Sequence, residues 1–151
     1  MALVLRPLAD ADVEPVLDVW ERASRVGHPF LSDAFLAEER RRLAEQWLPA
    51  SETVVADDDG TVVGFVSLVG DEVGGLFVDP DRHRQGIGRR LLAHAVIGRD
   101  RLELGVFEAN VGARRFYAAL GFAEVGPSDD APVEGNVEVR MRLDRPGSPS
   151  R

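Results

Sequence analysis

The residues with the clearest potential for chemistry form one glycine-punctuated segment, Arg84-Gln85-Gly86-Ile87-Gly88-Arg89. An apolar stretch and an Asp-Pro-Asp turn precede it, and leucines at helical spacing follow it. Two glycines let the backbone approach a ligand closely, and the first amides of a helix have no partner within that helix. Because these amides and the helix dipole favour an anion, the segment predicts a site for a phosphorylated ligand.

Residue types that are missing narrow the chemistry further. The sequence has no cysteine, which excludes disulfides, thiolate nucleophiles and cysteine-based metal sites. All 18 basic residues are arginine, so the lysine of a Walker A loop is absent. The three histidines have no tight metal-ligand spacing, and we therefore expect no metal.

Length and charge bound the class of protein. With 151 residues, 44% of them hydrophobic, the chain predicts one domain over residues 1–143 and a disordered tail over 144–151. The net charge of −8 argues against binding to nucleic acid or anionic membranes and mildly favours cationic partners. Without an apolar span or a signal-peptide pattern, a cytoplasmic location is expected.

The elements that must position these residues alternate between strands and helices. Strands are expected at residues 3–5, 53–56, 62–69, 73–78, 102–107, 122–125 and 137–143. Helices are expected after a cap at Asp10 or Asp12, over 34–47 with an end at Pro49, over 85–97, and after a cap at Asn110. Trp20 and Trp47 are expected in the core, and residues 38–42 on a solvated face. This order predicts a mixed α/β domain with an antiparallel first half and one parallel crossover.

Three features together resemble the GNAT superfamily of acyl-CoA-dependent N-acetyltransferases. The first is the segment Leu76-Phe77-Val78-Asp79-Pro80 leading into the glycine segment, similar to the family's pyrophosphate-binding motif. The others are Asn110-x-x-Ala113-x-x-Phe116-Tyr117-x-x-Leu120-Gly121-Phe122 and an Asp-Gly hairpin that ends in Val63-Gly64-Phe65. The likeness covers residues 3–143. It implies a largely antiparallel sheet of about seven strands, about four flanking helices and a splayed strand pair that holds the cofactor.

The resemblance implies acetyl-CoA as co-substrate. The pantetheine arm would pair with the backbone of Leu76, Phe77 and Val78 as a substitute strand does. The pyrophosphate would meet the amides of Arg84, Gln85, Gly86, Ile87, Gly88 and Arg89. Asn110 corresponds to a residue that touches the arm, and Tyr117 to the tyrosine whose hydroxyl faces the thioester sulfur.

The implied reaction is direct acetyl transfer to a primary amine of a small molecule or a protein, with Tyr117 protonating the departing thiolate. Glu108 and His28 resemble residues of small bacterial members and are candidates for the base, with a relayed water as a third option. Phe30 and Leu31, beside His28, are expected to line the acceptor site. The oligomeric state is expected to be a monomer or a homodimer.

Two positions depart from the family pattern. In the branch that acetylates protein N-termini, a glutamate five residues before the asparagine serves as base, and that slot here is Gly105. His83 stands where the pyrophosphate motif usually opens with Gln or Arg. Membership of that branch is therefore not expected, and the motif does not identify the base.

Plainer interpretations exist for each feature. The glycine segment alone also fits an ordinary strand-to-helix turn, and a dinucleotide fingerprint would need a glycine where Leu91 stands. Spacing alone allows Tyr117 to be a core residue, Asn110 a helix cap, His28 a loop histidine and Glu108 a solvated carboxylate. The alternative function is a non-catalytic acyl-CoA-binding or sensor module, against which the intact Tyr117 argues.

Overall fold

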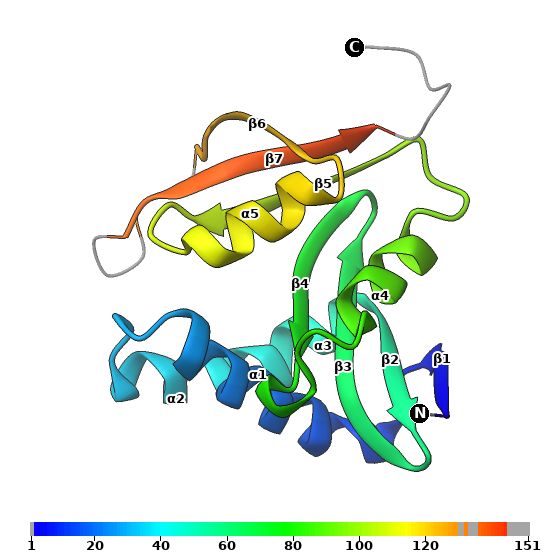
Figure 1. Cartoon of the computed structure of the whole chain (residues 1–151). Helices are drawn as coiled ribbons and strands as arrows, with labels where there is room; N and C mark the ends of the chain where they lie inside the picture. The colour runs from blue at the N-terminus through cyan, green and yellow to red at the C-terminus, as the bar shows by residue number, and fades with distance from the viewer. Residues whose placement is uncertain (1, 130–131, 133–135, 145–151) are drawn as a thin grey trace.

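Seven strands of the described part of the chain form one sheet in the order β1-β2-β3-β4-β5-β7-β6 (Figure 1). The computed structural model describes residues 2–129, 132 and 136–144. The strands are β1 (Leu3–Pro7), β2 (Glu52–Asp58), β3 (Thr61–Val69), β4 (Glu72–Val78), β5 (Arg101–Phe107), β6 (Ala123–Pro127) and β7 (Glu138–Asp144). Among these described strands only β4 and β5 pair in parallel, which confirms the predicted mixed, largely antiparallel sheet.

Helices cover both faces of the sheet. On one face lie α1 (Val13–Gly27), α2 (Asp33–Arg42), a π-helical turn η2 (Leu43–Trp47) and α3 (Leu48–Ala50). On the other face lie α4 (Ile87–Ala95) and α5 (Val111–Ala119) (Figure 1). Each face has its own apolar core, which we call the α1 core and the α4 core. Because β2 and β3 lie between the two cores, most of their side chains are buried regardless of which way they point.

The hairpin between β2 and β3 has the predicted turn. Asp59 and Gly60 both have positive φ angles, 50° and 92°, as tight hairpin turns require. The Asp57 carboxylate accepts a hydrogen bond from the Gly60 amide at 2.6 Å. The turn therefore fixes the register of the two central strands.

The sheet opens between β4 and β5. These strands pair only at Glu72 with Glu103 and at Val73 with Leu104. A bulge follows at once, because Ser67 of β3 faces Gly75 and Leu68 faces Val73, which leaves Gly74 without a partner. From there β4 continues along β3 and β5 along β7, so the edge of β4 that faces β5 has no strand partner from Gly74 to Val78. This gap is the splayed pair that the resemblance implied.

The second helical segment differs from its prediction at Pro49. The segment stays helical to Ala50, and the Leu48 amide donates to the Leu43 carbonyl in a π-helical turn. Proline has no amide to donate and crowds the carbonyl four residues earlier, so a wider turn before Pro49 accommodates it without ending the helix. Asp12 occupies the N-cap position of α1 as predicted, but its carboxylate does not cap that helix and instead accepts from the Ala9 amide and from Arg6.

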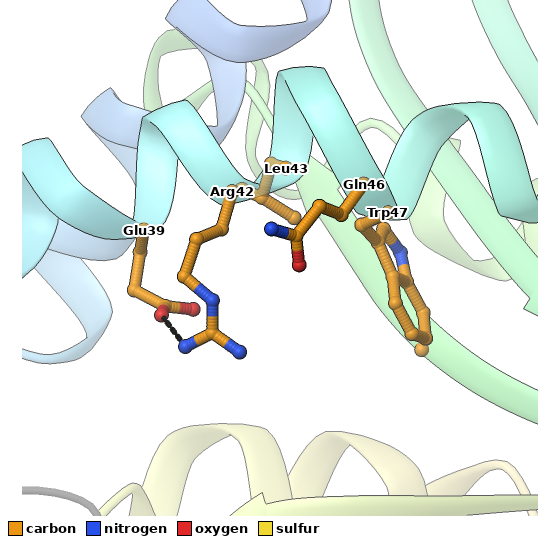
Figure 2. A pocket seen from close by; sticks show the side chains of 6 residues that line it. Glu39, Arg42, Leu43, Gln46 and Trp47 are labelled. Atoms are coloured by element: carbon orange, nitrogen blue, oxygen red, sulfur yellow. Dashed lines mark hydrogen bonds and ion pairs between the residues drawn. The ribbon is translucent and has the colours of Figure 1, made fainter.

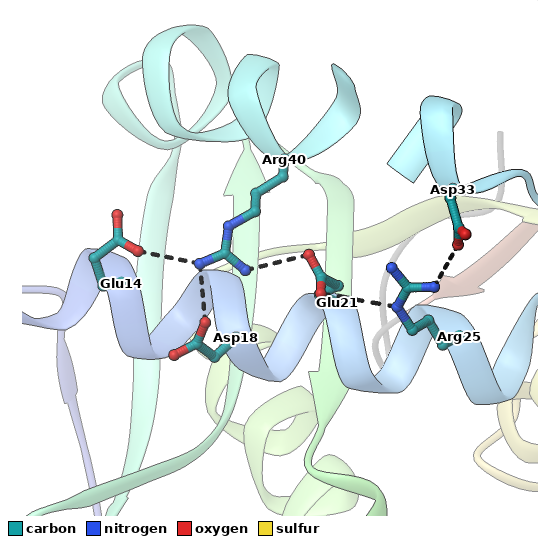
Figure 3. Close-up of polar contacts among 6 residues, drawn as sticks. All are labelled: Glu14, Asp18, Glu21, Arg25, Asp33 and Arg40. Atoms are coloured by element: carbon teal, nitrogen blue, oxygen red, sulfur yellow. Dashed lines mark hydrogen bonds and ion pairs between the residues drawn. The ribbon is translucent and has the colours of Figure 1, made fainter. Parts of the chain in front are cut away.

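Arginine bridges lock α2 against α1 (Figure 3). Arg40 reaches Glu14, Asp18 and Glu21, which lie one turn apart on α1, at 3.1, 2.9 and 3.5 Å. Arg25 of α1 pairs with Asp33 of α2 at 2.7 Å. The run at 38–42 is therefore not simply a solvated face, because Arg40 fixes the loop that joins the two helices.

Within the described ranges, no helix is long and apolar enough to cross a lipid bilayer. Strand β7 runs to Asp144, and the tail predicted beyond it lies outside the described residues.

Candidate active site

The glycine segment adopts a conformation suited to an anion. Arg84 and Gly86 have positive φ angles of 66° and 77°, and Gln85 between them does not. Backbone whose φ angles alternate in sign turns successive amides toward one concave site. Gly86 is the N-cap of α4 and offers no side chain, so no side chain caps the first amides of this helix. The helix begins at Ile87, two residues later than predicted, which places the glycine turn directly before it.

Three arginines surround this turn. Arg84, Arg89 and Arg90 are exposed, and no ion pair within the described part of the chain involves them. By contrast, Arg22 of α1 does form an ion pair. It contacts Asp79 at 2.7 Å and so holds the start of the loop between β4 and α4. The unpaired guanidinium groups thus lie around the open amides, where a phosphate would be favoured.

Close packing fixes the turn relative to α5. A Cβ atom on Gly88 would lie 3.2 Å from the Phe116 ring and 3.7 Å from Val78. A side chain at this position would have to displace the Phe116 ring by a few tenths of an ångström, so glycine suits the close approach of α4 to α5 and the end of β4. The position of Tyr117, which follows Phe116, is therefore coupled to the anion site.

Tyr117 is buried with its hydroxyl unsatisfied. The residue is 9% exposed, and its ring contacts Phe116 and Phe122 with centroids 5.3 and 5.4 Å away. Among the described residues, none forms a hydrogen bond with the hydroxyl. Burial raises the pKa of Tyr117 above its usual range, so the group is a proton donor rather than a base. An orphaned buried hydroxyl is the kind of group that a ligand completes.

Asn110 connects α5 to the α1–α2 loop. Its side-chain oxygen accepts from the Ala113 amide at 3.0 Å, which confirms the predicted cap, and its nitrogen lies 3.3 Å from His28 Nδ1. The cap fixes the amide orientation, so the NH2 group must donate to Nδ1 and the His28 hydrogen must lie on Nε2. Burial lowers the pKa of His28, in keeping with this neutral form.

An aromatic cluster forms around the same histidine. His28, Phe30 and Phe107 have ring centroids 5.1 to 5.7 Å apart. Phe30 is exposed on its other side, whereas Leu31 packs into the α1 core. Phe30 can therefore line an acceptor site, and Leu31 anchors the loop that carries it.

The other candidates lie apart from this cluster. Glu108 is exposed after the end of β5, and its amide donates to the Val137 carbonyl at 2.8 Å. The structure shows no contact of its side chain with Tyr117 or His28 within the described residues. On β4, Leu76 and Val78 point into the α4 core and Phe77 toward the α1 core, so their backbones line the gap. Within the described part, no group of three or more metal-binding side chains is found.

Two pockets meet at the bulge of β4, and sequence reasoning found neither. One of about 270 Å³ lies under the α2–η2 segment (Figure 2) and is lined by Glu39, Arg42, Leu43, Gln46, Trp47 and Gly74. The other, of about 180 Å³, is lined by Trp47, Glu72, Val73, Gly74, Gly105, Glu138 and Arg140. Trp47 is thus a pocket wall and not the core residue that was expected.

The close approach of Trp47 to the strand explains its position. A Cβ atom on Gly74 would lie 1.8 Å from the indole, so only glycine permits the contact. A glycine inside a strand often marks a bulge or a close approach, and this was the available signal. The charges at Glu138 and Arg140 alternate along β7, which also indicates an uncovered face.

Comparisons with known proteins agree with this geometry. The model of the Acetyltransferase (GNAT) family matches residues 17–122. Peptidyl-lysine N-acetyltransferase YjaB of Salmonella typhimurium is 35% identical over 130 residues, which cover 85% of this chain and 89% of that protein. The solution structure of apo-form YjaB from Escherichia coli has a TM-score of 0.84 at 28% identity, covering 94% of this chain and 97% of that one.

A structure with coenzyme A shares the fold. The paia N-acetyltransferase from Thermoplasma acidophilum in complex with coenzyme A has a TM-score of 0.78 at 19% identity, covering 96% of this chain and all of the other. The family match spans more than half of the chain, and the YjaB relative is covered over most of its length. The chain therefore belongs to the GNAT family, whose members use acetyl-CoA, and it is an N-acetyltransferase that moves an acetyl group to an amine.

Proposed function

We propose that this enzyme acetylates the side-chain amine of lysine in peptides or proteins, with acetyl-CoA as the acetyl donor. The observation that carries the choice of acceptor is the charge around the 180 Å³ pocket. There Arg140 pairs with Glu72 and interacts electrostatically with Glu103 and Glu138, so three carboxylates face one guanidinium. Such a surface favours a protonated amine. YjaB, named as a peptidyl-lysine N-acetyltransferase, supports the same acceptor.

The features of the cofactor side fit acetyl-CoA. The open amides from Arg84 to Arg89 and the unpaired guanidinium groups suit the pyrophosphate. The unpaired edge of β4 at Leu76, Phe77 and Val78 suits the peptide-like pantetheine arm. Bound there, acetyl-CoA supplies an activated thioester.

Tyr117 acts as the general acid in this proposal. Its raised pKa keeps the hydroxyl protonated across the working range of pH, and with no hydrogen bond to any described residue it is available to the departing sulfur. A positioned acid is worth about 10²–10⁴ in rate. A backbone amide on the open edge of β4, near Val78, stabilises the charge that develops on the thioester oxygen.

His28 has a positioning role in this scheme. Its Nδ1 accepts from Asn110 and its Nε2 carries the hydrogen, so neither nitrogen has a free lone pair for an incoming proton. Together with Phe30 it forms an apolar wall beside β5. Glu108 is exposed and remains a candidate base, but a water molecule would have to carry the proton from the amine to its carboxylate.

A panel of acceptors tests the proposal. Three peptides are compared with acetyl-CoA: one with lysine and a blocked N-terminus, one with a free N-terminus and no lysine, and one with neither amine. Free-thiol release and mass spectrometry of the peptide report transfer. Turnover with the lysine peptide alone is the expected result. Binding of acetyl-CoA without turnover on any amine would favour the acyl-CoA sensor instead.

A further inference from the structure

The 180 Å³ pocket reaches the gap between β4 and β5 from the face opposite α4 and α5. Leu102, Leu104 and Val106 of β5 point into the α4 core, so Gly105 lies on the other face of the strand. Gly74 of β4 meets Trp47, which approaches from the α1 side. Because residues from both sides of the gap line this pocket, an acceptor that enters here arrives opposite Tyr117, which lies in the α4 core.

Glu138 fills the space that Gly105 leaves empty. Its Oε2 atom lies 3.4 Å from the position of a Cβ on Gly105, and Arg140 Nη1 lies 3.5 Å from the same position. Glu138 pairs with Phe107 in the register of β5 and β7, so its side chain leans along the sheet toward the point where the strands separate. The Glu138 carboxylate thus lies over the backbone of β5 and lines the pocket.

We propose that Glu138 is the general base of the reaction and that this pocket receives the lysine side chain. The inference rests on the proposed function. The aliphatic part of the lysine packs against the Trp47 indole, and its ammonium group meets the Glu138 carboxylate. Glu138 takes one proton from the ammonium group, and the neutral nitrogen forms a bond to the thioester carbon.

The remaining protons balance as the C–S bond breaks. Tyr117 donates its hydroxyl proton to the departing sulfur. The nitrogen loses a second proton as it becomes an amide, and this proton restores the Tyr117 hydroxyl. Glu138 releases its proton to solvent. The products are the acetylated lysine, coenzyme A as a thiol and one proton. An amine with a pKa near 10.4 is only about one part in a thousand neutral at pH 7.4, so the base is required there.

Glu72 is the second carboxylate that lines this pocket, and Arg140 holds it in a bidentate pair. Both Glu72 oxygens accept hydrogen bonds from Arg140, one of them at 2.8 Å, in a bidentate pair. Two charge-assisted hydrogen bonds from one guanidinium fix the Glu72 carboxylate in place. Arg140 also lines the pocket and interacts electrostatically with Glu138.

The test compares Glu138→Gln with Glu124→Gln, a carboxylate of β6 that pairs with Arg114 outside the pocket. Both are assayed with the lysine peptide from pH 7 to pH 10, and acetyl-CoA affinity is measured by calorimetry. Glu138→Gln should lower kcat about 10²–10⁴-fold at pH 7.4 and leave acetyl-CoA affinity within about twofold. The ratio of wild-type kcat to Glu138→Gln kcat should fall about tenfold for each pH unit, because the lysine amine then loses its proton to solvent without a base. Glu124→Gln should match the wild type.

A second variant, with the carboxylate moved to another strand, distinguishes the loss of a base from damage to the structure. Gly105→Glu in a Glu138→Ala background, where the space beside Gly105 is empty, places a carboxylate there from β5, and it should restore part of the activity. If Glu138→Gln keeps the activity and pH profile of the wild type, Glu138 is not the base. A pH-independent loss that Gly105→Glu does not rescue also overturns the inference. Wild-type enzyme that acetylates no lysine peptide would overturn the proposed function itself.

Discussion

Tyr117→Phe should make the enzyme more stable and much less active. The Tyr117 hydroxyl is buried and has no hydrogen-bond partner among the residues that the structure describes, and phenylalanine keeps the ring and its contacts with Phe116 and Phe122. An unsatisfied buried hydroxyl costs about 1–3 kcal/mol. Its removal should raise the free energy of unfolding by about 1 kcal/mol, or the melting temperature by about 2–4 °C.

The same substitution removes the proposed acid. The loss in kcat should be about 10²–10⁴-fold, because the departing thiolate then has no positioned proton donor. Acetyl-CoA affinity should change by less than about threefold, since the hydrogen bond strengthens only as charge develops on the sulfur. Chemical denaturation, thiol release and calorimetry measure the three quantities on one pair of proteins.

The single tyrosine of the sequence permits a direct check. Burial raises the Tyr117 pKa, so ultraviolet titration of the folded protein should show tyrosinate only above pH 10. The unfolded chain ionises near pH 10, so the folded state should lose stability as the pH rises beyond that value. A less stable Tyr117→Phe variant would mean that the hydroxyl is satisfied, and full activity would remove it from catalysis.

Three further outcomes follow from the same structure. Gly86→Val should abolish thermal protection by acetyl-CoA, whereas Gly98→Val, at nearly the same φ angle (78° against 77°), should destabilise the fold comparably and keep the protection. Gly74→Ala should cost about 1–3 kcal/mol of unfolding free energy, and denaturation should show little cost when Trp47→Ala is also present. Because burial lowers the His28 pKa, stability should fall as the pH drops below about 6.5, and a flat pH dependence in His28→Gln would identify this residue as the cause.

The cofactor half of this enzyme could be predicted because its signals are local. The glycine turn, the Asn110 cap and the apolar strand before them each act through neighbouring residues. Positive φ at Gly86 and the cap on Ala113 are requirements of one turn and one helix start, and short sequence patterns record them. The element order followed for the same reason, with errors confined to helix ends such as Pro49.

The acceptor half could not be predicted because distant segments assemble it. Trp47 meets Gly74, and Glu138 meets Gly105, only after the bulge and the register of β7 are set. Helical spacing assigned Trp47 to a core, since periodicity cannot distinguish a buried face from a pocket wall. Gly105, which argued against one branch of the family, is what gives the Glu138 carboxylate its place.

A base supplied from β7 has a consequence for the acceptor. Three strands supply the negative charge around Arg140: Glu72 comes from β4, Glu103 from β5 and Glu138 from β7. The ammonium group of the substrate therefore meets carboxylates from all three strands. Strand β7 lies on the far side of β5 from β4, so its carboxylate does not occupy the gap between β4 and β5. The space between Trp47 and Gly105 is therefore open to the substrate. A long, unbranched side chain such as lysine crosses that width, whereas an amine on a peptide backbone would need the backbone itself to enter. Exchange of lysine for ornithine, which is one methylene shorter, should therefore lower kcat/KM more than it lowers binding of the peptide, and equal kcat/KM for the two would contradict the depth assigned to Glu138.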